Sequence, residues 1–261
     1  MDEQTLKTAL RQVAALRFFK TTGSTNDDAL EWADQNAPDF SIVIADRQTA
    51  GRGRLQRRWI TPAGTALAFS LILRPTEQET PRLALFTALG ALALSDVLKY
   101  DYRLESQIKW PNDVLIEGQK TAGILAEASW QGGRPQAVIL GIGVNVAPES
   151  VPARNQVLFP ATCIEAALGY KVERVELLAN LLDRIKSLRP AIGSLQFIQA
   201  WENRLAYKGK VVRIEQADHT ALVGVLIGLE GDGSLRLQVE TGKIVLIQAG
   251  DVRLRPVEAN R

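Results

Sequence analysis

The chain has 261 residues, enough to bury a hydrophobic core in one large domain or in one large and one small domain. Its 31 basic and 29 acidic residues nearly cancel, which disfavours a protein that coats nucleic acid. The single cysteine, Cys163, excludes an internal disulfide framework and a cysteine-based metal cluster, and the single histidine, His219, removes most histidine-dependent chemistry. Any catalysis must therefore rely on lysine, arginine, carboxylates and backbone amides.

The sequence also bears on targeting. No apolar run reaches the length of a membrane span, and the start, MDEQTLKTAL, lacks the apolar stretch of a signal peptide. We therefore expect a cytoplasmic protein that does not associate with membranes.

The first third of the chain predicts helices and short apolar strands in alternation. In chain order we expect a helix over residues 4–16, an extended segment from Phe18 to the stretch TTGSTN, a helix capped by Ser24, Thr25 or Asn26, and strands over 41–45 and 65–73.

The remaining elements fall into two groups. We expect a broad apolar helix over 80–99, two strands joined by a turn at 117–119, an apolar strand over 136–146, and helices over about 161–168, 172–188 and 194–206. After residue 206 the pattern changes to short β-like runs separated by glycine turns. The prediction is an α/β domain over residues 1–206 followed by a small β-barrel over 207–261.

The stretch 51–59, GRGRLQRRW, puts four arginines into nine residues. A solvated basic loop is one interpretation. However, the alternating glycines let the backbone approach a ligand closely, and arginine binds phosphate or carboxylate through two hydrogen bonds. Trp59 adds a large apolar surface, and the spacing of a P-loop is missing. The stretch therefore indicates a binding site for a small anionic ligand.

The stretch KWPND, residues 109–113, has two interpretations. Pro-Asn-Asp is ordinary turn chemistry, and Lys109 could simply be a surface residue. Alternatively, a strand fixes Lys109 at its end, while Asn112 and Asp113 help to position phosphates or a magnesium ion. The residues of this stretch taken alone leave both open.

Two further stretches, KTAGILAE (120–127) and GIGVN (141–145), place glycines within predicted strands. The GxG of the second is not a dinucleotide fingerprint, because no third glycine and no helix follow it. We expect instead that the glycines let a ligand lie against the strands. The hydroxyl and amide groups of TTGSTN can hydrogen-bond a polar ligand group and cap a helix as well.

Taken in this order and at these spacings, STN, Q-x-x-GRGR with a following tryptophan, KWPND, K-x-AGIL and GIGVN resemble the biotin protein ligases over roughly residues 20–147. The resemblance implies an α/β (α+β) fold: a mixed-sheet catalytic domain related to class II aminoacyl-tRNA synthetases, then a small SH3-like β-barrel. It also implies two reaction steps. Biotin carboxylate attacks the α-phosphate of ATP to give biotinyl-5′-AMP and pyrophosphate, and a lysine of a carrier protein then attacks the mixed anhydride.

The resemblance further implies roles for individual residues. The catalytic residues would be Lys109 and Arg54. Biotin and biotinyl-AMP would be bound by Ser24, Thr25, Asn26, Gln48, Arg52, Gly53, Arg54, Lys109 and Gly123. ATP and the adenylate would be bound by Gly51, Trp59, Asn112, Asp113, Lys120 and Asn145. No protein cluster would hold a metal; Mg²⁺ would arrive on the ATP phosphates, with Asp113 as the one candidate protein ligand.

Elementary electrostatics agrees with this assignment. Adenylation brings a carboxylate against a polyphosphate, so cations such as Arg54, Lys109 and Mg²⁺ are needed at the reacting centre. A loop that folds over the reactive adenylate would keep water out. Many members continue GRGRRG where this chain has GRGRLQ, but Leu55 and Gln56 lie past the residues expected to touch ligand.

The implied partners are biotin, ATP and the biotin carboxyl carrier protein of acetyl-CoA carboxylase, with no nucleic acid and no membrane, in a monomer or a homodimer. Members that double as repressors carry a winged helix-turn-helix domain before STN. Only 23 residues precede Ser24 here, so we expect a ligase without operator binding.

Two other kinds of protein share some of these sequence features. Lipoate protein ligases share the fold and the adenylation chemistry, but they would show an RR-x-x-GGG-type stretch and lack KWPND. A nucleic-acid-binding module is disfavoured by the near-neutral charge and by the lack of aromatic residues placed to stack on bases.

Overall fold

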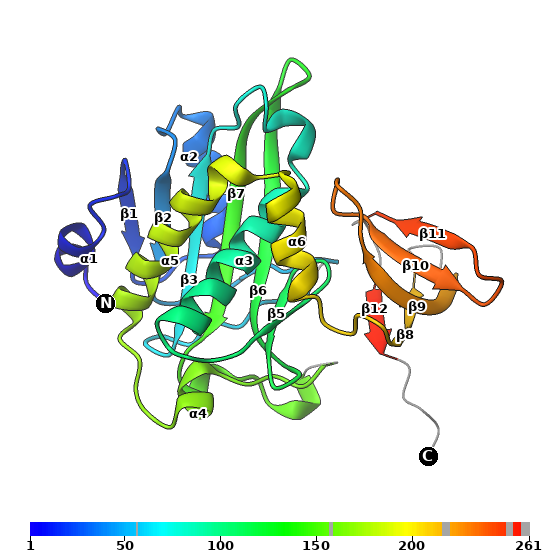
Figure 1. Cartoon of the computed structure of the whole chain (residues 1–261). Coiled ribbons are helices and arrows are strands. Elements are labelled where there is room, and N and C mark those ends of the chain that lie inside the picture. Colours follow the sequence, from blue (N-terminus) through cyan, green and yellow to red (C-terminus); the bar gives the residue numbers. More distant parts are fainter. Residues whose placement is uncertain (56, 157–158, 216–219, 249–252, 257–261) are drawn as a thin grey trace.

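The computed structural model describes residues 1–55, 57–156, 159–215, 220–248 and 253–256, so Gln56 and His219 lie outside the described residues. The chain forms a large mixed sheet with helices on both faces, and a smaller antiparallel sheet lies beside it (Figure 1). This arrangement confirms the predicted α/β unit followed by a β unit. The boundary between residues 206 and 207 stays a prediction.

The large sheet has the strand order β1-β2-β3-β7-β6-β5-β4; β1 runs parallel to β2, and every other neighbouring pair is antiparallel. Its strands are β1 (Leu16–Phe19), β2 (Ser41–Ala45), β3 (Ala66–Leu73), β4 (Gln107–Lys109), β5 (Asp113–Ile116), β6 (Gln119–Gln131) and β7 (Arg134–Asn145).

The helices flank this sheet. They are α1 (Glu3–Ala9), α2 (Thr25–Asp34), α3 (Leu85–Tyr100), α4 (Ile164–Leu168), α5 (Arg174–Leu188) and α6 (Leu195–Asn203), with 3-10 turns η1 (Thr80–Arg82), η2 (Pro148–Ser150), η3 (Arg154–Gln156) and η4 (Arg189–Ala191). In the part of the chain that the structure describes, no helix is both long and apolar enough to cross a membrane.

The two faces of the large sheet bury different side chains. Ile42 and Ile44 of β2 belong to the large core beneath α3 and α5, whereas Val43 between them packs against α2 on the other face. The α2 face is built mainly from small residues, and α2 itself contributes alanines to it. Asn26, in the first turn of α2, lies against Gly141 of β7. Beyond this point α2 no longer covers the sheet, and the cleft opens there.

Local propensity decided some elements and tertiary pairing decided others. The predicted helix over 4–16 is wrong, because α1 ends at Ala9. The following segment joins the sheet instead: the Ala14 amide donates to Phe40 O (3.1 Å), and the Ile42 amide donates to Ala15 O (2.9 Å). Backbone pairing with β2 therefore outweighs the helical spacing of the apolar residues. The strands predicted over 41–45 and 65–73 are confirmed as β2 and β3.

The helix predicted over 80–99 is divided into η1 and α3, and Pro81 occupies the first turn of η1. The other predicted helices are confirmed as α4, α5 and α6, which begin and end within a few residues of the expected bounds. Helix ends fray, so differences of this size carry no structural meaning.

The C-terminal sheet is antiparallel throughout and has the order β11-β10-β9-β8-β12. Its strands are β8 (Val211–Glu215), β9 (Ala221–Leu229), β10 (Leu235–Val239), β11 (Ile244–Ile247) and β12 (Arg253–Pro256).

This second sheet docks on the first unit through the turn between β9 and β10. The buried Trp110 Nε1 donates to Gly233 O (3.0 Å), and the Leu229 amide donates to Glu202 Oε2 (2.9 Å). Gly233 has a φ of 84°. A Cβ there would lie 2.8 Å from Leu85 and from Trp201, so the docked turn requires glycine. The tryptophan of KWPND is thus the anchor between the two units.

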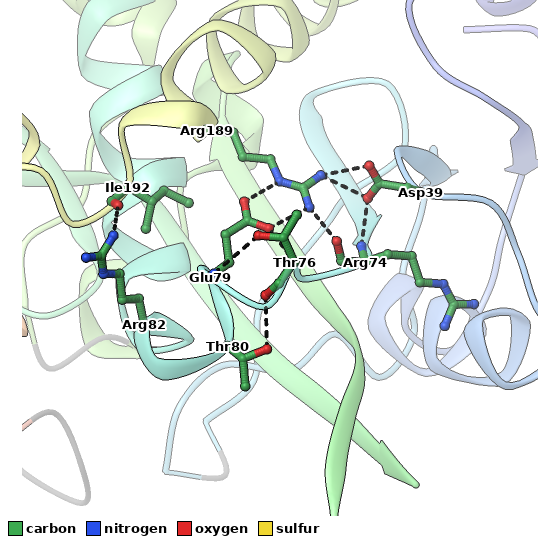
Figure 2. Close-up of polar contacts among 8 residues, drawn as sticks. All are labelled: Asp39, Arg74, Thr76, Glu79, Thr80, Arg82, Arg189 and Ile192. Atoms are coloured by element: carbon green, nitrogen blue, oxygen red, sulfur yellow. Dashed lines mark hydrogen bonds and ion pairs between the residues drawn. The ribbon is translucent and has the colours of Figure 1, made fainter.

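At the sheet end opposite the cleft, Arg189 fixes three segments together (Figure 2). Its guanidinium donates to both oxygens of Glu79 (2.8 and 3.0 Å), to both oxygens of Asp39 (2.9 Å each) and to Arg74 O (2.5 Å). Burial alone would raise the pKa of Glu79. The hydrogen bonds from Arg189 and from Thr76 outweigh burial and hold that pKa below the ordinary 4.5. This is the bidentate geometry that makes arginine–carboxylate pairs strong.

We expect Arg189→Ala to lower the free energy of unfolding by about 3 kcal/mol, because two carboxylates and a carbonyl lose their donor. Urea unfolding at pH 7 measures the loss, and Arg189→Lys, which keeps the charge without the fork, should lose less. Because the pKa of Glu79 is lowered on folding, its contribution is present above pH 4.5 and disappears as pH falls through the folded pKa. The Arg189→Ala loss should therefore shrink in acid, and equal urea midpoints for all three proteins at pH 7 would contradict this account.

Candidate active site

A cleft of about 700 Å³ opens on the α2 face of the large sheet, and it collects the motifs that the sequence singled out. Its lining includes Ser24, Thr25, Asn26, Gln48, Arg52, Gly53, Arg54, Trp59, Lys109, Asn112, Asp113, Lys120, Gly123 and Asn145. Gly51, the remaining predicted residue, is the buried first residue of the stretch 51–59, and a Cβ there would lie 2.5 Å from Trp59 O. Five segments far apart in the sequence thus meet in one cleft of a size typical of ligand sites.

The floor of the cleft is a row of small residues on neighbouring strands. Ala68 of β3 pairs with Gly143 of β7, which pairs with Gly123 of β6. The indole of Trp59 lies against this row: a Cβ at Gly143 would be 2.3 Å from Trp59 Cε2, and one at Gly123 would be 3.4 Å from Cζ3. The glycines therefore admit the indole of Trp59 onto the strands, and the predicted contact with a ligand stays a prediction. Among the described residues, the buried Trp59 Nε1 has no hydrogen-bond partner.

A cationic corner closes one end of the row. The Asp113 carboxylate lies 2.6 Å from Lys120 Nζ and 3.9 Å from Lys109 Nζ. Burial would raise the pKa of Asp113, but Lys120 and Lys109 outweigh it and hold that pKa below its usual value. Lys109 is 5% exposed, and its Nζ lies 4.3 Å from the centre of the Phe159 ring. Desolvation lowers the pKa of Lys109 to about 8, despite the opposing effect of Asp113.

The structure confirms the turn at KWPND and shows that Lys109 is not a surface residue, whereas the positioning of phosphates or magnesium by Asn112 and Asp113 stays a prediction. Asn112 Nδ2 donates to Ile124 O (3.0 Å), and the Ile124 amide donates to Asn112 O (2.9 Å), so the stretch is a turn tied to β6. At the same time β4 ends at Lys109 and presents it to the cleft, and Arg54 Nη1 donates to Asn112 Oδ1 (3.2 Å). The corner therefore brings three cationic side chains around one carboxylate, which suits an anionic ligand.

The stretch 51–59 folds back on itself. The Gly53 amide donates to Arg57 O (2.7 Å), the Trp59 amide donates to Gly51 O (2.8 Å), and Leu55 takes a left-handed conformation with φ 56°. The two arginines expected to bind the adenylate face different partners as a result. Arg54 lies beside Asn112 at the cationic corner, whereas Arg52 forms ion pairs with Asp27 and Glu127.

The first turn of α2 forms the other end of the cleft. Ser24 is the N-cap residue of α2, as predicted, although its side chain makes no capping hydrogen bond. Gln48 Oε1 accepts from the Thr25 amide (2.8 Å), while Gln48 Nε2 donates to Thr61 Oγ1 (3.1 Å). The Asn26 side chain lies between Ser70 and Glu127. This end offers hydroxyl and amide groups and is suited to a neutral polar ligand group.

Among the residues that the sequence analysis missed, Phe159 and Arg255 line the cleft, while Ser70 and Glu127 hydrogen-bond to the lining residue Asn26. Ser70 and Glu127 could have been identified from the sequence pattern. Ser70 is the polar residue inside the apolar run ALAFSLIL, and Glu127 follows Gly123 at a spacing of four, so both face the same side of β6. Phe159 and Arg255 come from a loop and from β12, and no local pattern marks either of them.

Size does not distinguish this cleft. A second depression, of about 690 Å³, is lined by residues that include Lys99, Glu105 and Arg204, and none of its lining residues belongs to the five motifs. The chemistry of the lining therefore selects the first cleft. Among the described residues, no group of three histidine, cysteine or acidic side chains is placed to hold a metal ion.

Known proteins with similar sequence and structure fall in one family. Residues 18–145 match the model of the Biotin/lipoate A/B protein ligase family. The Bifunctional ligase/repressor BirA of Bacillus spizizenii is 36% identical over 244 residues, which cover 92% of this chain and 74% of that protein. The Biotin--[acetyl-CoA-carboxylase] ligase of Paracoccus denitrificans is 35% identical over 231 residues, covering 86% of this chain and 95% of that protein.

A solved structure extends the likeness to the fold. The biotin protein ligase from Aquifex aeolicus in complex with biotin and ATP matches with a TM-score of 0.81 and 30% sequence identity, covering 94% of this chain and 100% of that chain. Both units of the present structure are therefore included in the match. With relatives above 30% identity over nearly their whole length, the chain belongs to the biotin protein ligases.

Proposed function

We propose that the chain is an ATP-dependent biotin–[acetyl-CoA-carboxylase] ligase. The observation that carries the proposal is the cationic corner of Arg54, Lys109 and Lys120 at the end of the glycine row, assembled from four of the five motifs, with the fifth, STN, at the opposite end of the cleft. A flat apolar acid and a polyphosphate can meet there with their charges neutralised. Membership of the biotin protein ligases supplies the identity of the acid.

The two ends of the cleft suggest the orientation of the substrates. The ureido group of biotin would lie at the polar end, beside Ser24, Thr25 and Gln48, with Asn26 and Gly123 along its path. The carboxylate would then reach Lys109 and Arg54. The adenylate would lie under the loop of Gly51, Arg52 and Gly53, against Trp59, with Asn112, Asp113, Lys120 and Asn145 around its phosphate and ribose.

In the first step a biotin carboxylate oxygen bonds to the α-phosphorus of ATP, and the bond from that phosphorus to the bridging oxygen breaks, releasing pyrophosphate. The side chains of Lys109, Lys120 and Arg54 would lower the repulsion between the two anions. In the second step the amine of a carrier-protein lysine bonds to the acyl carbon, the acyl–oxygen bond breaks, and AMP leaves with that electron pair. The proposed carrier is the biotin carboxyl carrier protein of acetyl-CoA carboxylase.

ATP would enter as its magnesium complex, and the metal would help to neutralise the leaving pyrophosphate. Asp113 is the one acidic residue in the described lining, and its two oxygens already face Lys120 and Lys109. The donor set therefore suits a metal held mainly by the phosphates, with Asp113 as its nearest protein carboxylate. A monomer or a homodimer stays our prediction for the assembly.

Incorporation of radiolabelled biotin into a carrier domain tests the proposed function. Label should reach the carrier only when ATP and Mg²⁺ are present, and lipoate in the same assay should not replace biotin. In a thermal melt, biotin with MgATP should raise the melting temperature beyond either alone, and an oligonucleotide should not. Transfer of lipoate but not biotin would overturn the substrate assignment.

The pKa of about 8 for Lys109 predicts a pH profile. Lys109 is charged below that pH and neutral above it, so kcat/KM for biotin in pyrophosphate release should fall above about pH 8. Lys109→Arg keeps the charge and should move this fall to higher pH. Lys109→Ala should lower the rate by about 100-fold or more at pH 7, because a cation at the reacting centre is lost. A Lys109→Ala enzyme with the wild-type rate and profile would remove Lys109 from the mechanism.

Arg54→Gly is expected to affect retention of the intermediate. The variant loses the contact with Asn112 and one cation of the corner, while Lys109 remains. Biotinyl-AMP should therefore dissociate about 10- to 100-fold faster, as measured by rapid gel filtration of labelled adenylate. Arg47→Ala is the matched control, since Arg47 is an exposed arginine close to the same loop and does not line the cleft. Unchanged retention in Arg54→Gly would show that this arginine does not hold the adenylate.

A further inference from the structure

Glu127 of β6 accepts three hydrogen bonds from two residues of the cleft. Its Oε1 accepts from Arg52 Nη1 (3.0 Å), and its Oε2 accepts from Arg52 Nη2 (2.7 Å) and from Asn26 Nδ2 (2.7 Å). Arg52 belongs to the glycine–arginine loop, and Asn26 belongs to the first turn of α2. One carboxylate thus joins the loop above the cleft to the helix at its polar end.

The hydrogen bonds of Asn26 show what this carboxylate does. Asn26 is 5% exposed, and Ser70 Oγ lies 2.6 Å from its Oδ1 and 2.8 Å from Thr25 Oγ1. The single hydroxyl proton of Ser70 can serve only one of these acceptors at a time. Glu127 Oε2 can accept but not donate, so it requires the NH₂ of Asn26 on its own side. The oxygen of the amide is thereby turned toward Ser70, and Leu125 O, which accepts from the same NH₂ at the longer distance of 3.4 Å, supports this orientation.

The loop is fixed through the same group. Arg52 and Glu127 form a fork-to-fork pair, the geometry in which arginine and a carboxylate bind most strongly. Asp27 also lies 2.7 Å from Arg52 Nη2, but its side chain is 57% exposed and solvent screens it, whereas the Glu127 side chain is 27% exposed. Glu127 is therefore the stronger of the two anchors, and its carboxylate also accepts a hydrogen bond from the Asn26 side chain.

We propose that Glu127 is a positioning residue of the biotin site: it fixes the orientation of the Asn26 amide and holds the Arg52 end of the loop above the bound ligand. The proposal rests on the proposed function, because the ligand that these groups enclose is biotin or its adenylate. Glu127 does not touch the reacting atoms. Its loss should therefore weaken binding and retention while leaving the chemical step largely intact.

Three variants separate the two tasks of Glu127. Glu127→Ala removes both. Glu127→Gln keeps an oxygen for Asn26 but places an amide NH₂ against the guanidinium of Arg52, so it should restore only the Asn26 half. Asp27→Ala is the matched control, because it removes a carboxylate at the same distance from Arg52 without touching Asn26.

We expect Glu127→Ala to raise KM for biotin about tenfold and to speed biotinyl-AMP release by a similar factor, with kcat for pyrophosphate release within about twofold of wild type. Glu127→Gln should lie between wild type and Glu127→Ala in KM, with fast release. Asp27→Ala should change each quantity by less than about twofold. Arg52→Ala combined with Glu127→Ala should lose less than the sum of the single losses, since the pair is already broken.

Several results would overturn the proposal. These are an unchanged KM and release rate in Glu127→Ala, a loss confined to kcat, equal effects of Asp27→Ala and Glu127→Ala, or additive losses in the double variant. Should Glu127→Ala fail to fold by circular dichroism, the near-isosteric Glu127→Gln decides through its release rate. If instead the wild-type chain does not transfer biotin at all, the proposed function fails, and this outcome is distinct from every result on Glu127.

Discussion

The alternation of side chains along β3, β6 and β7 is the constraint on which the rest of the molecule depends. Where these strands line the cleft, they turn large apolar residues such as Leu67, Ile124 and Ile142 to the α3 and α5 face and Ala68, Gly123 and Gly143 to the α2 face, so that Ile142 lies in the core between Gly141 and Gly143 in the cleft. Because the period is two, the core and the site are separated by one residue. The packed face keeps the sheet rigid, and the row of small residues on the other face gives a flat ring, such as the Trp59 indole, close access to the backbone.

The C-terminal unit is part of the same construction. The strand that carries Lys109 pairs with the segment leading to that unit: the Ile108 amide donates to Arg204 O (2.7 Å), and the Ala206 amide donates to Ile108 O (2.9 Å). Trp110, the next residue along from Lys109, anchors the turn at Gly233. From β12, Arg255 lines the cleft and lowers the pKa of Lys109, in addition to the larger effect of burial. Docking of the second unit therefore helps to set the charge state of a residue in the first.

The sequence predicted most of the strands and most of the residues of the cleft, since both leave local marks. An apolar β-branched run such as 41–45 has few alternatives, and glycines and arginines at fixed spacing are rare in a core. The helix over 4–16 failed because the pairing of residues 14–19 with β2 is a long-range contact. Arg255 and Phe159 were missed for the same reason: each reaches the cleft only through the folded chain. The hydrogen bonds of Glu127 to Asn26 and Arg52 likewise form only when the helix and the loop are folded against β6.

In the glycine–arginine loop, neighbouring arginines have different partners. Composition alone made Arg52 and Arg54 equivalent, but the hairpin closed between Gly51 and Trp59 turns them to different sides. Arg52 meets carboxylates and is neutralised within the protein, while Arg54 stands among Lys109 and Lys120, where the protein supplies fewer negative than positive groups. An arginine with carboxylate partners anchors a loop, and one beside other cations favours an incoming anion. The loop can therefore remain folded while its inner arginine faces a phosphate.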